Sequence, residues 1–352
     1  MKLLAGKKRK VAVLLTSGIG DALLFTPLLR ELKQKGFIIT CIFYSKFDND
    51  CFFDPSLVDS KVFIRSKLSL LWYSLTRLRY FSNYYINHFG NGHTIRLAAQ
   101  ICSKRVTKTC TGYKAVDRSK RNRAVFPELT DAEQNLHLLY SRANAKITDI
   151  KKFHQQAVLP LPAGLIKNNS KQNRPYFIVQ VSAGNNRTPF KNWPMQNWVT
   201  LIERLCRSYP NFEFVIAGDD TESEYIKTLE NIDCTNCSIL IGKTTVKEVF
   251  ALTGNSAGYI GLDSGIMHMA VALQKRTVTI FGASNESLYG YETLNPGDHK
   301  VIRSSLTCRP CSGWKNANTS RVNDPMLCPD FACLNSITPG LVFEQIIAHF
   351  NL

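Results

Sequence analysis

The stretch "GYIGLDSGIMHMAVALQKRTVTIFG", residues 258–282, predicts a strand, a tight turn, a helix and a second buried strand. The small residues Asp263, Ser264 and Gly265 follow the first strand and open the helix. Such a turn aims several backbone N–H groups and one hydroxyl at one point, which suits a diphosphate. His268 lies one turn into the helix, where it could hydrogen-bond a phosphate or a ribose. Taken alone, the pattern fits a capped helix with a buried histidine equally well.

Strand-like and helix-like segments alternate along the whole chain, which predicts α/β layers built on parallel sheets. Strands are expected at 10–15, 37–44, 61–65, 83–89, 176–181, 212–218, 238–242, 258–262 and 277–282. Helices are expected at 21–34, from Thr130, and from near Pro194, Thr221, Thr245 and Ser264. The stretch 158–175 is rich in Pro, Gly, Asn and Lys and has the composition of a linker. We therefore expect two Rossmann-like domains, residues 1–160 and 172–352, facing a central cleft.

Charge is distributed unevenly over the 352 residues. The net charge is +17, and residues 1–127 carry 23 Lys and Arg against 7 Asp and Glu, which is +16. The excess favours an anionic partner for the first third, such as nucleic acid, an acidic membrane or a phosphorylated substrate. A solubilising surface is the alternative. Because Asp21 ends the first apolar run early, we expect a strand of a cytoplasmic protein there and no signal peptide.

A glycine-rich turn, "TSGIGDALLFTPLLREL" (16–32), follows the first expected strand. Gly18 and Gly20 would normally indicate a phosphate site, yet the turn ends in a carboxylate, Asp21. Two loops follow strands of the second half. One contains Gly184 and then Lys191, and the other contains Glu222. A lysine before a helix can meet a phosphate, and a carboxylate at a strand end often binds ribose hydroxyls.

Taken together, these motifs resemble glycosyltransferase family 9, the bacterial lipopolysaccharide heptosyltransferases. The resemblance rests on Gly-Ile-Gly-Asp before a helix, on Ala183-Gly184 followed by Lys191-Asn192-Trp193-Pro194, and on Asp263-Ser264-Gly265 followed by His268. It implies a GT-B fold and inverting transfer of heptose from an ADP-sugar. It also implies that residues 1–160 bind the acceptor and that residues 172–352 bind the nucleotide sugar.

The resemblance gives each candidate residue a role. Asp21 would be the catalytic general base, beside Gly18 and Gly20 at the acceptor. Lys191 would stabilise the departing ADP. The donor site would include Gly184, Glu222, Asp263, Ser264, Gly265 and His268. No cofactor is required for this catalysis.

The acceptor implied by the resemblance is the Kdo- and heptose-containing core on lipid A, displayed at the cytoplasmic face of the inner membrane. The basic first domain would then meet an anionic membrane surface as a peripheral protein. The aromatic, aliphatic and basic stretch 68–85 could rest on that interface. A core helix followed by a strand accounts for its composition equally well.

Four cysteines cluster in residues 308–333, at Cys308, Cys311, Cys328 and Cys333. Similar late clusters occur in some relatives, including protein-modifying heptosyltransferases that carry iron. The spacing could hold a structural zinc or iron, with free thiols or disulfides as alternatives.

Three other functions remain open on the sequence alone. The same fold could use another sugar or a protein acceptor. A nucleic-acid-binding protein fits the charge, but no recognised binding motif is present, so no nucleic-acid partner is expected. A nicotinamide-dependent oxidoreductase would need G-x-G-x-x-G, and the first turn continues after Gly20 as Asp21-Ala22-Leu23.

Overall fold

The computed structural model describes residues 9–15, 18–44, 53, 56–86, 93–108, 130–137, 139, 174–183, 188–219, 225–311 and 325–352. The chain divides into two compact units, one drawn from residues 1–165 and the other mainly from 166–352. The expected linker, 158–175, lies outside the described residues except for its last two. Within the described ranges, no helix has the length and apolarity needed to cross a bilayer.

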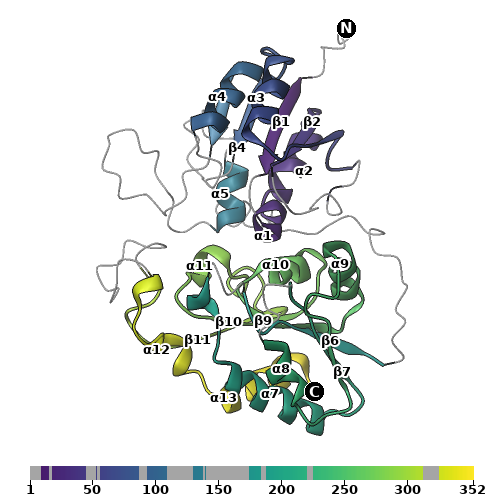
Figure 1. Ribbon diagram of the computed structural model, residues 1–352, viewed down its shortest axis with the longest axis vertical. Helices are drawn as coiled ribbons and strands as arrows, with labels where there is room; N and C mark the ends of the chain where they lie inside the picture. The colour runs from purple at the N-terminus through teal and green to yellow at the C-terminus, as the bar shows by residue number, and fades with distance from the viewer. Residues whose placement is uncertain are drawn as a thin grey trace. The chain divides into compact units, whose positions relative to one another are not determined.

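The first unit is built on a five-stranded parallel sheet in the order β3-β2-β1-β4-β5 (Figure 1). Its strands are β1 (Lys10–Leu15), β2 (Ile38–Phe43), β3 (Ser60–Phe63), β4 (Asn83–Ile86) and β5 (Val106–Lys108). The central strand β1 is an unbroken apolar run because both of its faces are covered. The four strands predicted for this half are confirmed, and β5 is an addition.

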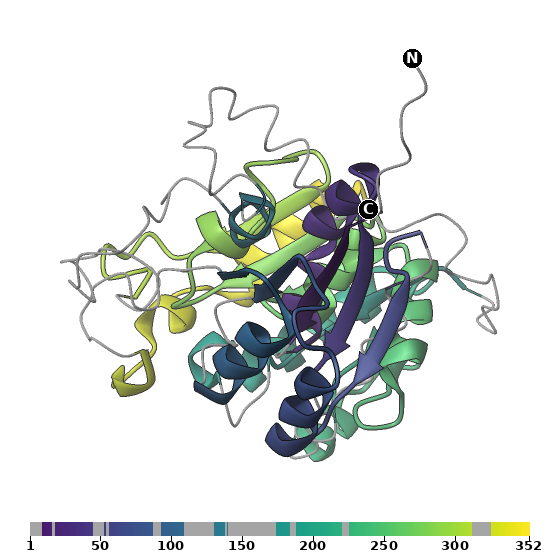
Figure 2. The same cartoon turned by 90° about the horizontal axis from the view of Figure 1, so that it is seen from above.

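Five helices are described in this unit: α1 (Ile19–Leu23), α2 (Thr26–Gln34), α3 (Lys67–Leu75), α4 (His93–Cys102) and α5 (Asp131–His137). The prediction of one helix over 21–34 was wrong, because the segment forms two. Pro27 cannot continue a helix, since its ring would meet the carbonyl of Leu23, but it is well suited to the first turn of α2. Helices α3 and α4 lie side by side (Figures 1 and 2).

The second unit is built on a six-stranded parallel sheet in the order β11-β10-β9-β6-β7-β8. Its strands are β6 (Tyr176–Val179), β7 (Glu213–Ile216), β8 (Cys237–Ile239), β9 (Gly258–Leu262), β10 (Thr277–Phe281) and β11 (His299–Arg303). All five strands predicted for this half are confirmed, and β11 is an addition.

Helices cover both faces of this second sheet. Figure 1 shows α7 (Met195–Ser208), α8 (Ile226–Glu230) and α13 (Pro339–Phe350) on one face, with α9 (Val246–Asn255) and α10 (Gly265–Ala272) on the other. The remaining short helices are η4 (Pro189–Lys191), α11 (Glu286–Tyr289), η7 (Pro325–Leu327) and α12 (Ala332–Asn335). The helices predicted near Pro194, Thr221, Thr245 and Ser264 correspond to α7, α8, α9 and α10, although Thr221 itself lies outside the described residues.

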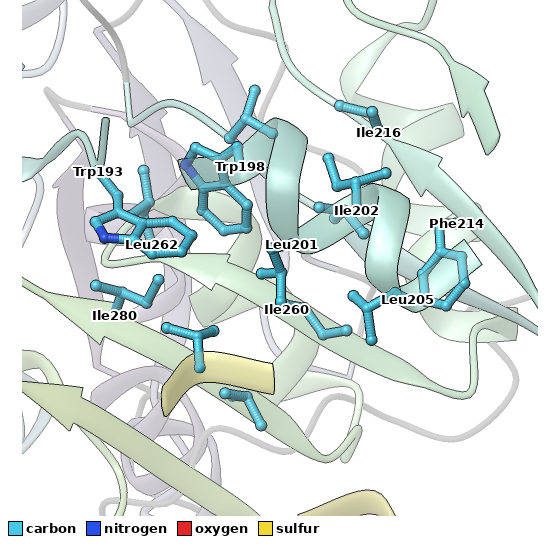
Figure 3. Close-up of a cluster of buried hydrophobic side chains, with 14 of the residues drawn as sticks. Trp193, Trp198, Leu201, Ile202, Leu205, Phe214, Ile216, Ile260, Leu262 and Ile280 are labelled. Atoms are coloured by element: carbon cyan, nitrogen blue, oxygen red, sulfur yellow. The ribbon is translucent and has the colours of Figure 1, made fainter. Parts of the chain in front are cut away.

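The core of the second unit forms where α7 meets the sheet (Figure 3). Trp198, Leu201 and Leu205 recur at the spacing of one helix face, and all three are fully buried. The ring of Trp193 packs edge-on against Trp198 with centroids 5.0 Å apart, and its Nε1 donates to the carbonyl of Ile337 at 2.9 Å. Both tryptophans therefore pack in the core and fix the segment that carries Lys191.

Candidate functional site

Each sheet has a point where the direction of its winding reverses. In the first unit this point lies between β1 and β4, and in the second it lies between β6 and β9. Ligands of open α/β sheets bind outside the carboxyl ends of the strands at such a point. The turn carrying Gly18, Gly20 and Asp21 follows β1, and the turn Asp263-Ser264-Gly265 follows β9. The topology thus places both predicted motifs where a ligand is expected.

In the second unit, the turn after β9 is held by an ion pair. Lys191 Nζ lies 2.7 Å from Asp263 Oδ2 and 3.4 Å from the backbone oxygen of the same residue. The Asp263 side chain is 3% exposed, whereas the Lys191 side chain is 17% exposed. The lysine therefore connects the start of α7 to the start of α10 and keeps part of its charge accessible.

The charges at this turn set the protonation of two buried groups. Burial by itself would raise the pKa of Asp263, but Lys191 and His268 bring that pKa below its ordinary value. Burial lowers the pKa of His268 to about 4. His268 is therefore neutral at pH 7, and its Nδ1 lies 2.6 Å from the hydroxyl of Tyr291. The site presents one accessible cation, one buried carboxylate and a neutral imidazole.

A polar network beneath the turn fixes Ser264, the N-cap of α10. The Ser264 hydroxyl accepts from the Met267 amide at 3.5 Å and bonds to the side-chain oxygen of Gln180. The Tyr259 hydroxyl lies 2.9 Å from the same Gln180 oxygen and 3.3 Å from Ser264 Oγ, and it accepts from the Leu262 amide at 3.0 Å. Sequence reasoning missed Gln180 and Tyr259 because a strand tyrosine looks like ordinary core.

Gly261 makes room for this network. A Cβ at this position would clash with the Tyr259 hydroxyl and would lie 3.1 Å from the Cβ of Gln180. The glycine between Ile260 and Leu262 in the quoted motif is the one sequence signal of the network, since a glycine inside a strand often marks a close approach.

In the first unit, Gly18 is the N-cap of α1, and Asp21 lies in the first turn of the helix, after Ile19 and Gly20. The Ala22 amide donates to the Gly18 carbonyl at 3.2 Å, which closes this first turn. Gly18 has φ −63° and ψ −177°, and a Cβ added there would meet nothing within 4 Å. Neither backbone strain nor packing against the described residues requires a glycine at position 18.

Two predicted donor residues, Gly184 and Glu222, lie outside the described residues. The edges of the loop that contains Gly184 are described. The Ala183 amide donates to Asn192 Oδ1 at 2.8 Å, and the Thr188 hydroxyl donates to the Ala183 carbonyl at 2.7 Å. These bonds close the loop immediately before Lys191.

The four cysteines Cys308, Cys311, Cys328 and Cys333 line one small cavity of about 10 Å³, together with Ala283, Arg309, Phe331 and Ala332. Burial, followed by the neighbouring thiols, raises the pKa of Cys311 to about 11. As they stand, no three His, Cys, Asp or Glu side chains of the described residues are arranged to hold a metal ion.

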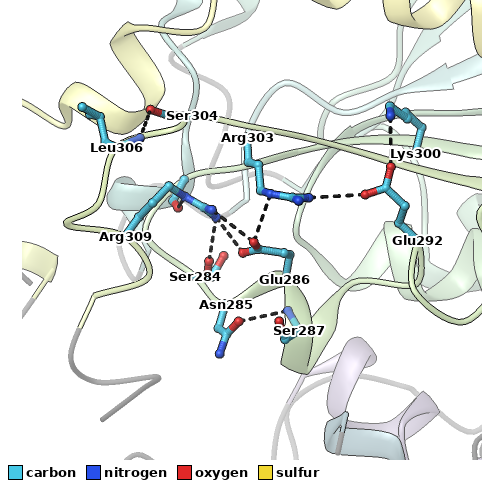
Figure 4. Close-up of polar contacts among 11 residues, drawn as sticks. Ser284, Asn285, Glu286, Ser287, Glu292, Lys300, Arg303, Ser304, Leu306 and Arg309 are labelled. Atoms are coloured by element: carbon cyan, nitrogen blue, oxygen red, sulfur yellow. Dashed lines mark hydrogen bonds and ion pairs between the residues drawn. The ribbon is translucent and has the colours of Figure 1, made fainter. Parts of the chain in front are cut away.

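An ionic network fixes one wall of this cavity (Figure 4). Arg309 is 5% exposed, and its Nη2 lies 2.8 Å from Glu286 Oε2 at the start of α11. Arg309 Nε donates to the Gly282 carbonyl at 3.0 Å, and the Cys311 amide donates to the Ala283 carbonyl at 3.0 Å. Cys308 and Cys311 are thereby attached to the turn after β10.

Comparisons with known proteins identify the family and the fold. Residues 89–320 match the family described as glycosyltransferase family 9 (heptosyltransferase). A segment of 138 residues is 28% identical to lipooligosaccharide heptosyltransferase 2 of Haemophilus influenzae, and it covers 39% of this chain and 36% of that protein. The chain thus matches little more than a third of that relative's length.

Two solved structures show the same fold. One is a family 9 glycosyl transferase from Veillonella parvula, with a TM-score of 0.69, 14% identity and 97% of both chains covered. The other is the E. coli ADP-heptose LPS heptosyltransferase II, with a TM-score of 0.65, 16% identity, and 97% of this chain and 98% of that chain covered. Both parallel sheets thus belong to a GT-B fold, and the chain belongs to glycosyltransferase family 9.

Proposed function

We propose that the protein transfers heptose from ADP-heptose to the inner core of lipopolysaccharide and inverts the anomeric centre. The observation that carries the proposal is the turn after β9, where Lys191 is paired with buried Asp263 at the start of α10. The names of the similar proteins, an ADP-heptose LPS heptosyltransferase and a lipooligosaccharide heptosyltransferase, support the choice of sugar and acceptor.

The departing ADP is assigned to the second unit. The backbone N–H groups of Gly265 and Ile266, in the first turn of α10, attract its phosphates. Lys191 adds a positive charge that Asp263 holds in one position. A charge fixed before the reaction stabilises the leaving group at little reorganisation cost. Because these groups carry the charge of the leaving diphosphate, the scheme needs no catalytic metal.

The acceptor hydroxyl is assigned to the first unit, where Asp21 acts as the general base. The carboxylate removes the hydroxyl proton as the oxygen bonds to the anomeric carbon. Gly18 and Gly20 would border the acceptor, and the open space at Gly18 supports this placement. The acceptor is the phosphorylated core on lipid A at the cytoplasmic face of the inner membrane, which suits the charge of +16 on residues 1–127.

The decisive experiment incubates the protein with ADP-heptose and core acceptors of defined truncation, and identifies the product by mass. A product one heptose heavier than a single acceptor supports the proposal. Transfer of another sugar, or transfer to a protein hydroxyl, would change the donor or acceptor assigned here and leave the proposed glycosyl transfer in place. Salt-dependent binding to nucleic acid without binding of ADP-sugars would reject the proposal.

A structural zinc or iron at the four cysteines is a second proposal, supported by the shared cavity. Thiolates suit both metals, and binding would require the four thiols to close around that cavity. Purified protein should contain about one metal ion per chain. Cys328→Ser should lower both metal content and melting temperature, whereas Cys234→Ser, at a half-buried thiol elsewhere, should leave the metal in place. Metal-free protein of full stability would favour free thiols or disulfides.

A further inference from the structure

Helix α3 exposes apolar side chains along one face. Leu68 is 79% exposed, Trp72 is 71% exposed and Leu75 is 51% exposed. Their spacing of four and then three residues puts them on the same side of the helix. Leu78, in the turn after the helix, is 69% exposed. We call these four residues the α3 face.

The helix that carries this face is firmly attached to the first unit. On its opposite side, Leu70 and Ser74 are fully buried, and the Ser74 hydroxyl donates to the Leu70 carbonyl at 2.9 Å. Ser66 caps the start of α3 by accepting from the Ser69 amide at 3.1 Å. The exposure of the α3 face therefore does not come from a frayed end. A packed helix normally turns its apolar stripe inward, and an exposed apolar cluster is typical of an interaction surface.

Positively charged residues lie on both sides of the α3 face along the chain. Arg65 and Lys67 stand exposed at the start of the helix, and Arg79 stands exposed after Leu78. Residues 60–108 contain nine Lys and Arg and no Asp or Glu. The guanidinium of Arg77 lies over the ring of Tyr73, 4.1 Å from its centroid. An apolar cluster with cations on both sides of it along the chain complements a surface that is apolar beneath a layer of negative charge.

We propose that the α3 face docks on an anionic lipid leaflet. Leu68, Trp72 and Leu75 enter the boundary between headgroups and acyl chains, and Arg65 and Lys67 pair with lipid phosphates. An exposed tryptophan suits this boundary because its ring is apolar and its N–H is polar. The inference rests on the proposed function in one respect, since a lipid-linked acceptor would bring the enzyme to such a leaflet. Lipid binding itself can be measured without any transfer.

The test uses full-length protein and two kinds of vesicle, phosphatidylglycerol mixed with phosphatidylcholine, and phosphatidylcholine alone. Co-sedimentation measures binding, and a blue shift of tryptophan emission reports the transfer of Trp72 into lipid. The parent should bind the mixed vesicles, and added salt should weaken binding. Replacing Leu68, Trp72 and Leu75 with Gln should reduce binding at least tenfold. Arg65→Gln with Lys67→Gln should reduce it by about thirtyfold at low salt.

Matched controls come from the second unit. Leu327→Gln changes a leucine that is 70% exposed, and Lys227→Gln with Lys247→Gln removes two exposed charges. These controls should bind vesicles as the parent does, and all variants should keep the parent's melting temperature because the changes are on the surface. Equal loss in the lysine control would show charge attraction without a specific face, and equal loss in the leucine control would show that the apolar contribution is not specific to α3. Either result overturns the proposal.

Three other outcomes also overturn it. The glutamine triple variant could bind as tightly as the parent, or the parent could bind phosphatidylcholine vesicles equally well. The parent could also form a dimer that the triple variant does not, without binding vesicles, and the face would then join two copies. A water-soluble core acceptor separates this question from the proposed function. Heptose transfer to this acceptor should be unchanged in the triple variant. If the parent does not transfer heptose to it, the proposed function is rejected and the lipid-docking proposal is not affected.

Discussion

The ion pair between Lys191 and Asp263 serves both stability and the proposed chemistry. The Asp263 side chain is 3% exposed, so its carboxylate depends on the lysine for compensation. The same lysine is 17% exposed, so it remains available to an anion that reaches the start of α10. A single substitution should therefore affect both properties, and their dependence on pH should tell them apart.

Lys191→Met removes the charge and keeps most of the side-chain volume. At pH 7 the free energy of unfolding should fall by about 3 kcal/mol, because a buried carboxylate loses its partner. In the parent, the pKa of Asp263 is lowered, so its contribution is present above the unfolded value and is lost as pH falls through the folded one. In the variant, burial raises that pKa, so the variant gains stability as pH falls. The difference between the two proteins should narrow from pH 7 to pH 4.

Denaturant titrations at several pH values measure this difference. Lys191→Met with Asp263→Asn is the control and should show no such narrowing. If the difference in unfolding free energy between the parent and Lys191→Met does not change with pH, then Lys191 does not stabilise the Asp263 carboxylate. Turnover of the single variant within about threefold of the parent, which is under ~1 kcal/mol, would place the donor site elsewhere.

Substitution by alanine should affect stability little at Gly18 and strongly at Gly261. Gly18→Ala adds a Cβ in open space at an allowed backbone conformation, so stability should stay within about 0.5 kcal/mol of the parent. Gly261→Ala forces a Cβ onto the Tyr259 hydroxyl and should cost about 2 kcal/mol. Melting curves check both values. If Gly18 borders the acceptor, Gly18→Ala should raise the acceptor KM several-fold, and an unchanged KM would remove Gly18 from the site.

At the scale of elements, the turn between β9 and α10 is positioned by side chains from two strands. Gln180 follows β6 and Tyr259 lies within β9, and both bond to Ser264 at the start of the helix. The switch point of the sheet is therefore also the point where the polar network joins its two halves. This network orients the backbone N–H groups to which the ADP phosphates are assigned.

Tyr259→Phe should disturb that orientation. It leaves the Leu262 amide and the Gln180 side chain without the hydroxyl, which should cost about 1–3 kcal/mol of stability. The KM for the ADP-sugar should also rise, because Ser264 loses a contact. Tyr176→Phe is the matched control, since its hydroxyl donates to the Leu252 carbonyl at 2.7 Å within the same unit. It should lower stability without changing that KM. Equal effects on KM would reduce the network to a structural role.

Elements could be predicted from the sequence where the local pattern and the packing agree. The strand, turn and helix around Ser264 are an example. An apolar strand ends at a capping turn, and the helix that the turn opens is followed by a second apolar strand. Helix α3 shows the opposite case. Leu68, Trp72 and Leu75 have the spacing of a buried stripe, but the fold buries Leu70 and Ser74 instead. Long-range packing made that choice, and no local pattern encodes it. The split of the predicted helix 21–34 was encoded by Pro27, and its effect was overlooked.

At the scale of the whole molecule, the two sheets carry different groups beside their switch points, after β1 in the first unit and after β9 in the second. The turn at the first switch point ends in the carboxylate of Asp21, and the turn at the second presents helix N–H groups and Lys191. The charge follows the same division, with +16 on residues 1–127 out of a total of +17. The order of the motifs carried the resemblance to family 9, and that resemblance implied the GT-B fold. Contacts such as Lys191 with Asp263 were not predictable, because they join residues 72 apart in the chain.

The most direct test of the account is the turnover of Asp21→Asn, measured with melting temperature and ADP-sugar affinity on one preparation. Asparagine keeps the size of the side chain and tolerates the first turn of α1, so folding and donor binding should stay near the parent values. It cannot accept the proton of the acceptor hydroxyl, so turnover should fall by roughly 10²–10⁴-fold. Turnover near the parent's, or a loss explained by a lower melting temperature, would contradict the assignment of Asp21 as the general base.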